Sequence, residues 1–368
     1  MNPSALVLGS LVFFAFSGCL HVAEDRAERD RTVGHAANEG AEVHVADGLA
    51  AVRAFAPGTV ELWTEAPALR FEIATPAGGG ARTWTLRLRN VLPDAEVRAQ
   101  LANGAALPLA TSRPARTEMR VSLELPPGAR ATFTLSAPDA SSLEPWRFAA
   151  LADVQNALDR VEDIYRVMND DPAIRFVVFN GDLTERGTDE DLLLFQQKLG
   201  ALNVPLYATL GNHELGTRDD AFQTFYGRCS FSFFFRGVRF TLLDSASATL
   251  DPLVYSWLDG WLQQGRGDLH VVTMHIPPLD PVGERNGAFA SRPEANKLIA
   301  RLAAGHVDLT LYGHVHSYYA FSNGGIPAFI SGGGGAIPER LDGIGRHFLA
   351  VDVDPRAQKV STSFRPVD

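Results

Sequence analysis

Residues 175–182 read RFVVFNGD, a short apolar run that ends in a glycine and a carboxylate, and this pattern decides the fold class of the C-terminal part. Similar apolar runs occur at residues 147–152, 205–210, 238–244, 269–275 and 307–313. The segments between them carry apolar residues at helical spacing, at residues 156–169, 189–202, 253–264 and 292–303. Buried strands that alternate with helices predict a layered α/β domain, in which ligands gather at the carboxyl ends of the strands.

The region before this domain has a different pattern. It contains short runs in which apolar and polar residues alternate, such as TVELW at residues 59–63 and TWTLRLR at residues 83–89. Alternation with a period of two between Gly and Pro turns predicts a small antiparallel β-sandwich. We assign this sandwich to residues 41–138 and the layered domain to residues 145–368. The predicted sandwich contains no catalytic cluster, so we interpret it as a spacer or as a docking module for an unidentified protein partner.

The N-terminal residues indicate export. The first 23 residues contain no Asp, Glu, Lys or Arg, and the apolar stretch at residues 5–16 is too short to span a bilayer comfortably. We therefore assign residues 1–18 to a signal peptide. Ser17-Gly18-Cys19 resembles a bacterial lipobox, which implies a lipid anchor on Cys19 and a place in the cell envelope, facing the periplasm or the exterior. Cleaved soluble export and a retained anchor are the alternatives.

Composition and charge exclude several classes of protein. The 368-residue chain has 46% hydrophobic and 21% charged residues, which excludes a disordered chain or a membrane protein with many spans. Its net charge of −10 disfavours attraction to nucleic acid, and we expect no nucleic-acid binding. Residues 19–40 are charged and lack periodicity, so we expect a flexible tether between the lipidated cysteine and the sandwich.

Polar side chains follow five of the predicted strands. They occur in the clusters Asp153-Val154-Gln155, Gly181-Asp182, Gly211-Asn212-His213-Glu214, His275 and Gly313-His314-Val315-His316. Asp153, Asp182 and Asn212 are separated by 29 and 30 residues, about one strand–helix–strand repeat, so neighbouring parallel strands can bring them together. Oxygen and imidazole donors without thiolate suit Mn, Fe, Zn or Ni. Asp182, at the end of a central strand, could bridge two ions.

The charges of such a site favour a phosphate ester as substrate. Two divalent ions, two aspartates and a metal-bound hydroxide together carry about one positive charge, which attracts an anionic ester. Two neighbouring ions can also activate a water, orient a phosphoryl group and stabilise the entering and leaving oxygens.

Together, the clusters resemble the motifs of the calcineurin-like metallophosphoesterase family, D-x-H, G-D, G-N-H-[D/E], H and G-H-x-H, over residues 146–368. The resemblance implies a β-sandwich flanked by helices, preceded here by the small all-β sandwich, and two divalent or mixed-valence metal ions. It implies that one metal is held by Asp153 and His316, that Asp182 bridges, and that the other metal is held by Asn212, His275 and His314. It also implies that His213 contacts the substrate phosphoryl group as a general acid or charge stabiliser, with Glu214 as its supporting partner.

Gln155 departs from the family pattern, because it stands where most members have a histidine ligand. Three interpretations stay open: its amide oxygen binds a metal, its amide only hydrogen-bonds a metal-bound water, or that site is weak and the protein works largely with one ion.

We therefore expect a metal-dependent phosphoesterase that hydrolyses a phosphate mono- or diester by attack of a metal-bound hydroxide. The alternatives are a catalytically weak binding or scaffold lipoprotein with the same fold, and a metal-dependent hydrolase that acts on other bonds.

Overall fold

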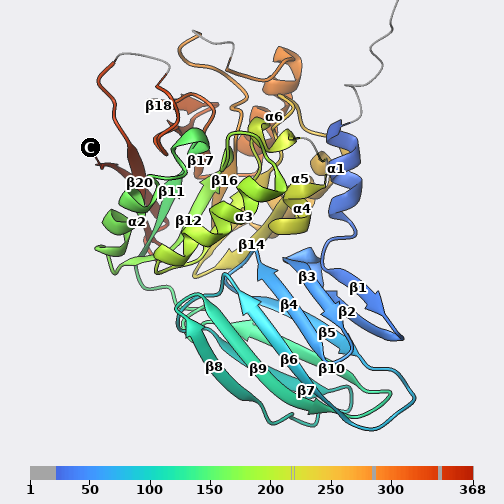
Figure 1. The fold of residues 1–368 in the computed structure, drawn as a ribbon. Coiled ribbons are helices and arrows are strands. Elements are labelled where there is room, and N and C mark those ends of the chain that lie inside the picture. Colours follow the sequence, from blue (N-terminus) through green and yellow to red (C-terminus); the bar gives the residue numbers. More distant parts are fainter. Residues whose placement is uncertain (1–21, 217, 219, 284–286, 339–341, 368) are drawn as a thin grey trace, which may run out of the picture.

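The computed structural model describes residues 22–367, apart from residues 217, 219, 284–286 and 339–341. The predicted signal peptide and Cys19 lie outside the described residues. The chain forms an N-terminal lobe of strands and a larger C-terminal lobe of strands and helices (Figure 1). Within the described part, none of the helices has both the length and the apolar character needed to cross a membrane.

The N-terminal lobe is a β-sandwich. One of its sheets has the strand order β1 (His35–Asn38), β2 (Ala41–Val45), β5 (Leu69–Ala74), β10 (Arg130–Ser136), β7 (Glu96–Leu101). The facing sheet has the order β3 (Ala50–Ala56), β4 (Thr59–Thr64), β6 (Arg82–Arg89), β9 (Glu118–Leu125), β8 (Ala110–Ala115), and the short 3₁₀ helix η1 (Ala46–Gly48) precedes β3. Alternate residues of the strands are buried, as in β2, so each sheet turns one apolar face inward.

One strand pair of this sandwich differs from the sequence-based expectation. We expected an antiparallel sandwich, but β4 and β6 pair in parallel. The reason is topological, because β5, which lies between them in the chain, belongs to the other sheet. The chain therefore crosses the sandwich and returns to the first sheet in the same direction.

The C-terminal lobe contains the sheet β13 (Leu206–Thr209), β12 (Ile174–Asn180), β11 (Trp146–Leu151), β20 (His347–Asp354), β21 (Lys359–Pro366). The second sheet runs β14 (Phe231–Phe235), β15 (Val238–Leu243), β16 (Leu269–Met274), β17 (Leu309–Tyr312), β19 (Ile326–Ser331), β18 (Tyr318–Asn323). The helices are α2 (Glu162–Asn169), α3 (Asp189–Lys198), α4 (Ala221–Phe225), α5 (Pro252–Gln264) and α6 (Arg292–Ala304), with the 3₁₀ turns η2 (Gln155–Ala157), η3 (Leu199–Ala201) and η4 (Asn212–Leu215).

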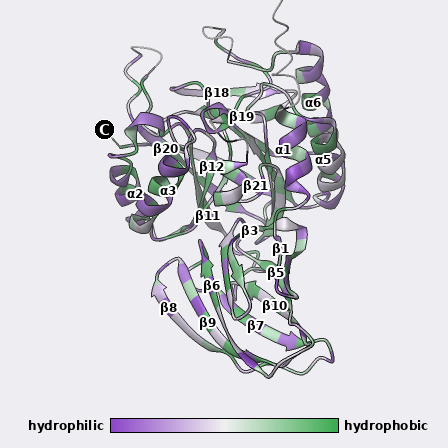
Figure 2. Ribbon diagram, turned by 45° about the vertical axis from the view of Figure 1, so that its right-hand side comes forward, coloured by the Kyte–Doolittle hydropathy of each residue, from purple (hydrophilic) through white to green (hydrophobic). Residues whose placement is uncertain are grey.

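Aromatic side chains fill the space between these sheets. Phe148 and Phe176 from the first sheet contact Phe240 from the second, with ring centroids 5.1 and 5.3 Å from it. Helices α2 and α3 pack on the outer face of the first sheet, and α5 and α6 on the outer face of the second. Figure 2 shows hydrophobic residues along the strands in the middle of this lobe and a mixture of hydrophobic and hydrophilic residues on the helices. The predicted layered fold, a sandwich flanked by helices, is confirmed.

Helices α3, α5 and α6 begin after residues that capping chemistry favours. Thr188, Asp251 and Ser291 each accept a backbone hydrogen bond at the start of α3, α5 and α6. The prediction that the first helix of this lobe begins at residue 156 was wrong, because α2 begins at Glu162. Left-handed backbone at Asp153 and Gln155, and the 3₁₀ turn η2 after them, hold the preceding segment out of the helix.

The expectation of a flexible tether over residues 19–40 was wrong for its described part. Val22–Asp30 forms helix α1, and β1 already pairs with β2. Arg26 of α1 is buried and donates to Asp244 at 2.7 Å, while Asp30 accepts from the backbone amides of Cys229 and Ser230, both at 2.9 Å. The charges that suggested a solvated segment have buried partners roughly two hundred residues away in the chain.

Candidate metal centre

Parallel strands of the two C-terminal sheets end at a common edge. In the first sheet β11, β12 and β13 run parallel, and Asp153, Asp182 and Asn212 follow their carboxyl ends. In the second sheet β16 and β17 run parallel and are followed by His275 and His314. The structure thus places at one edge the side chains that the strand–helix–strand spacing predicted to converge.

Among the described residues, the potential ligands form two groups that share one carboxylate. The first group is Asp182, His275 and His314, and the second is Asp153, Asp182 and His316. In each group the potential ligand atoms lie within 4.8 Å of one another. Asn212 joins the first group, since its Oδ1 lies 3.0 Å from Nε2 of His275.

Backbone carbonyls fix the histidine rings in the form that binds a metal. Nδ1 of His275 donates to the carbonyl of Asn180 at 2.8 Å, and Nδ1 of His316 donates to the carbonyl of Ile337 at 2.7 Å. Because a carbonyl can only accept, each Nδ1 carries the proton and a neutral ring leaves its Nε2 lone pair free. Nε2 of His275 lies 3.2 Å from Asp182, and Nε2 of His316 lies 3.6 Å from Asp153. The donor set therefore fits two divalent cations that share Asp182.

Strained backbone positions these side chains. Asp153, Asp182 and His314 have φ angles of 63°, 57° and 71°, a left-handed conformation that non-glycine residues adopt at a cost of about 1–3 kcal/mol. Hydrogen bonds hold the strained residues in place. The amide of His314 donates to both oxygens of Asp153 at 3.1 and 3.0 Å, and the amide of His213 donates to Oδ1 of Asp182 at 2.9 Å.

His314 and His316 lie outside the strand that precedes them. Within a strand, alternation would turn both rings to one face, but β17 ends at Tyr312, so the pair lies in the loop that follows. The left-handed backbone at His314 sends the two rings into different groups, His314 toward Asp182 and His275, and His316 toward Asp153 and Asp182.

Glu214 does not support the ring of His213 as expected. Its carboxylate accepts from the backbone amides of Asp182 at 2.9 Å, Gly211 at 2.8 Å and Thr184 at 2.9 Å. Glu214 thereby ties the loop after β12 to the loop after β13. The ring of His213 instead donates from Nδ1 to the carbonyl of Glu185 at 2.7 Å, and its Nε2 lies 3.9 Å from Asp182.

Gln155 turns its amide nitrogen toward the centre. Its Nε2 donates to Oδ2 of Asp182 at 2.8 Å and lies 3.1 Å from Nε2 of His316. An amide nitrogen has no lone pair available for a metal, so ligation through oxygen requires the amide to turn over. In the arrangement seen here, Gln155 is a hydrogen-bond donor to the shared carboxylate.

The sequence motifs and this geometry agree with a comparison against known families. Residues 147–318 match the family model of the calcineurin-like phosphoesterases. This part of the chain belongs to that family. The family resemblance predicted from the motifs is thereby confirmed.

Individual relatives of the calcineurin-like phosphoesterase domain are distant. A probable glycerophosphodiester phosphodiesterase, GpdQ, from Arcobacter nitrofigilis is 39% identical over 51 residues, which is 14% of this chain and only 19% of that relative. A dimetal phosphatase from Danio rerio is 16% identical, covering 61% of this chain and 96% of its own, with a TM-score of 0.46. PhoD is 12% identical, covering 81% and 86% of the two chains, with a TM-score of 0.48.

Burial and charge act against each other in the phosphoesterase site. Burial raises the pKa of Asp153 well above its usual value. Burial also acts to raise the pKa of Asp182, but the positive charge of His275 outweighs it and holds that pKa below the usual range. Burial acts to lower the pKa of His275, and the Asp182 carboxylate raises it to about 9. Without cations, the Asp153 carboxyl and the His275 ring therefore retain protons, which bound cations replace.

Residue types alone did not reveal several contacts that build the site. The carbonyls of Asn180, Glu185 and Ile337 orient the three histidine rings, and a backbone carbonyl leaves no signal in the sequence. The buried side chain of Asn180, which accepts from Thr273, was also missed, although it directly precedes the Gly-Asp motif.

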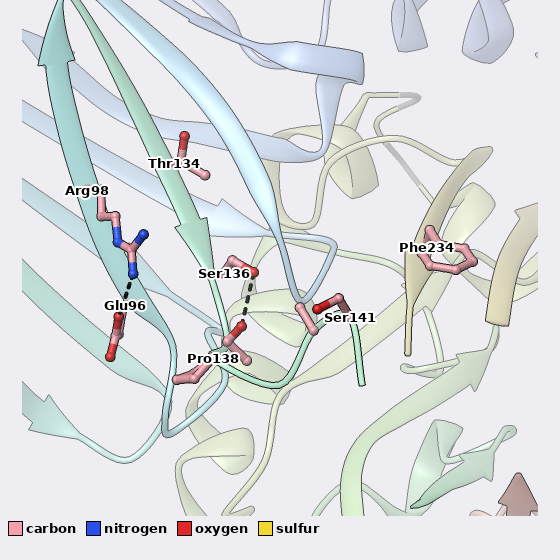
Figure 3. Close-up of a pocket in the computed structure, with 9 residues that line it drawn as sticks. Glu96, Arg98, Thr134, Ser136, Pro138, Ser141 and Phe234 are labelled. Atoms are coloured by element: carbon pink, nitrogen blue, oxygen red, sulfur yellow. Dashed lines mark hydrogen bonds and ion pairs between the residues drawn. The ribbon is translucent and has the colours of Figure 1, made fainter. Parts of the chain in front are cut away.

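A pocket of about 460 Å³ is lined by the N-terminal lobe, the segment that follows it and Phe234 of β14 in the C-terminal lobe (Figure 3). Its charged residues, Glu96 and Arg98, pair with each other at 3.5 Å, and Ser136 donates to the neighbouring carbonyl of Ala137. The described residues that line it include none of the predicted ligands. This pocket therefore carries no chemistry related to the metal centre.

Proposed function

We propose that the chain is a metal-dependent phosphoesterase that hydrolyses a phosphate mono- or diester. The observation that carries this proposal is the buried carboxylate of Asp182, which belongs to both groups of potential ligands in a calcineurin-like phosphoesterase domain. One ion would be held by Asp153, Asp182 and His316, and the other by Asp182, Asn212, His275 and His314. Two divalent ions bound there would neutralise the phosphate charge and lower the pKa of a coordinated water so that it can attack phosphorus.

The chain's own residues position the substrate and move protons. We assign to His213 the contact with the phosphoryl group, because its side chain is 25% exposed and its Nδ1 already donates to the carbonyl of Glu185. Its Nε2 is therefore the ring atom that faces the shared carboxylate and the substrate. A proton on this nitrogen can stabilise a phosphoryl oxygen or pass to the leaving oxygen.

We also propose that the protein is exported to a bacterial cell envelope and anchored to a membrane by a lipid on Cys19. The uncharged N-terminal stretch and the Ser17-Gly18-Cys19 motif support this proposal. The N-terminal sandwich would then lie between the anchor and the phosphoesterase domain, as a spacer or docking module.

The proposal of activity is tested with p-nitrophenyl phosphate and bis(p-nitrophenyl) phosphate on the metal-reconstituted chain. We expect His213→Ala to lower kcat by about 10²–10⁴-fold with the metal content unchanged, as for loss of a general acid. Arg166→Ala, an exposed change on α2, is the matched control. If the unaltered protein hydrolysed both esters no faster than the His213→Ala variant, this result would contradict the proposal and favour a scaffold protein.

The second candidate function is a catalytically weak scaffold protein. The orientation of Gln155 favours it, because the amide nitrogen faces the shared carboxylate at the position where most family members have a metal ligand. A hydrolase of other bonds is the third, and inhibition by phosphate and vanadate separates it from a phosphoesterase.

A further inference from the structure

A second pocket, of about 210 Å³, opens beside His316 at the edge of the candidate metal centre. This volume corresponds to about seven molecules of liquid water, enough for a short organic group. The residues that line it include His316 itself, Gly332, Gly333, Gly335, Arg160 and Arg346. We call this cavity the substituent pocket.

The wall of the substituent pocket that adjoins the metal centre is glycine backbone. A Cβ on Gly333 would lie 2.4 Å from Nδ1 of His347, and a Cβ on Gly335 would lie 2.6 Å from Cβ of Ala157. A Cβ on Gly332 would lie 2.9 Å from Oδ2 of Asp153. The glycine run at residues 332–335 is therefore a close-packed turn that also brings the pocket up against a predicted metal ligand.

Two arginines give the pocket its positive charge. Among its described lining residues Arg160 and Arg346 are the charged ones, and none is a carboxylate. Among the described carboxylates close to it, Asp163 accepts from Arg166 at 3.0 Å and pairs with Arg346 of the pocket at 3.5 Å, and Asp342 accepts from Ser317 at 2.6 Å.

The two arginines have different roles. Arg346 is largely buried and donates to the carbonyl of Arg160 at 3.2 Å, so it is part of the wall. Arg160 is 60% exposed, and its closest ion pair, with the exposed Asp159, spans 4.0 Å. An ion pair of that length in water is weak. The guanidinium of Arg160 therefore has donors to spare for a bound anion.

We propose that the substituent pocket receives the group esterified to the phosphate, and that it selects a small anionic group such as a short carboxylic acid. This inference rests on the proposed function, because the pocket acts on substrates only if the phosphate binds at the adjacent centre. A cationic group of the same size would face Arg160 and Arg346 and be disfavoured.

Competitive inhibition tests this selectivity. Phosphoglycolate and phosphoethanolamine have similar size but carry a carboxylate and an ammonium group, and inorganic phosphate has no substituent. We would measure their inhibition constants against whichever p-nitrophenyl ester the metal-reconstituted chain hydrolyses, and their dissociation constants by calorimetry. We expect phosphoglycolate to bind about tenfold more tightly than phosphoethanolamine. Arg160→Ala should raise the ratio of the phosphoglycolate constant to the phosphate constant about fivefold, and the control Arg70→Ala, at an exposed arginine of the N-terminal lobe, should not change it.

The outcomes separate this inference from the proposed function. Equal binding of the two esters, tighter binding of phosphoethanolamine, or an unchanged ratio in Arg160→Ala would overturn the selectivity of the pocket. Absence of hydrolysis of either chromogenic ester would overturn the proposed function, while calorimetry would still decide whether the pocket prefers an anion.

Discussion

At the scale of single residues, Gln155 is the position that most distinguishes this site from its family pattern. The sequence predicted its place beside Asp153 and Asp182, and the structure puts it there. The sequence could not predict which end of the amide faces inward. The nitrogen does so because Oδ2 of Asp182 and Nε2 of His316, 2.8 and 3.1 Å away, both accept hydrogen bonds.

Replacement of Gln155 by His tests this arrangement. An imidazole nitrogen can bind a metal where the amide nitrogen cannot, so Gln155→His should tighten binding of the ion held by Asp153 and His316 by about tenfold. Titration of the metal-free protein with Mn²⁺ or Zn²⁺ measures the change. Gln196→His, at a buried glutamine that donates to the carbonyl of Phe225, serves as a control. Identical affinities for Gln155→His and the unaltered protein would show that this side chain contributes no ligand position.

At the scale of elements, the sequence predicted the central strands of the C-terminal lobe to within one or two residues, because apolar runs between turns identify buried strands. It did not predict where the loops bend after those strands. The late start of α2 and the separation of His314 from His316 both follow from left-handed residues, at Asp153, Gln155 and His314. Such residues are held by contacts distant in the chain, which a local pattern does not contain.

Two glycine-to-alanine substitutions distinguish the effect of a clash at the metal centre from the general effect of an added methyl group. In Gly332→Ala the new Cβ would lie 2.3 Å from the carbonyl of Val315 and 2.9 Å from Asp153, so we expect loss of metal binding and activity. In Gly260→Ala, within α5, the Cβ meets no atom within 4 Å, and we expect a gain of about 1 kcal/mol in the free energy of unfolding. Activity assays and urea unfolding measure both. Full metal content in Gly332→Ala would contradict the packing argument.

At the scale of the whole molecule, buried charged groups join the two lobes. Glu65, at the end of the N-terminal strand β4, packs against Gly227 of the phosphoesterase domain, where an added Cβ would lie 2.0 Å from Oε2. Asp30 of α1 lies in the same region. Sequence patterns missed this interface because charged residues normally indicate solvent, and only the assembled structure shows their burial.

Glu65 makes stability depend on pH. Burial raises the pKa of its carboxyl well above the usual value, and the Arg228 backbone amide offsets this only in part. Burial likewise raises the pKa of Asp30 to about 6. The folded protein thus holds these protons at pH values where the unfolded chain has lost them, so stability falls as pH rises above about 4.5, by up to about 1.4 kcal/mol per group and pH unit.

Glu65→Gln removes one of these two titrating carboxyl groups. We expect the Tm of the variant to exceed that of the unaltered protein by an amount that grows from pH 5 to pH 8, measured by thermal unfolding. Glu42→Gln, on the exposed side of β2, is the control and should show no such trend. A Tm difference that does not vary with pH would contradict the assignment to Glu65.

The proposed lipid anchor is tested by Cys19→Ser in cells. If Cys19 carries the lipid, the variant should move from the membrane fraction to the soluble fraction, because an unmodified serine gives no hydrocarbon to insert into the bilayer. Immunoblots of fractionated cells measure the distribution. Continued recovery of the variant with membranes would count against lipidation.

The most direct test of the central claim is a count of the metal ions that one chain holds after reconstitution and dialysis, made by mass spectrometry of the metals. If Asp182 joins two cation sites, the unaltered protein should bind about two divalent ions per chain, and Asp182→Asn, which preserves shape but removes the charge, should lose both. Retention of two ions by Asp182→Asn, or no more than about one ion in the unaltered protein, would contradict the account.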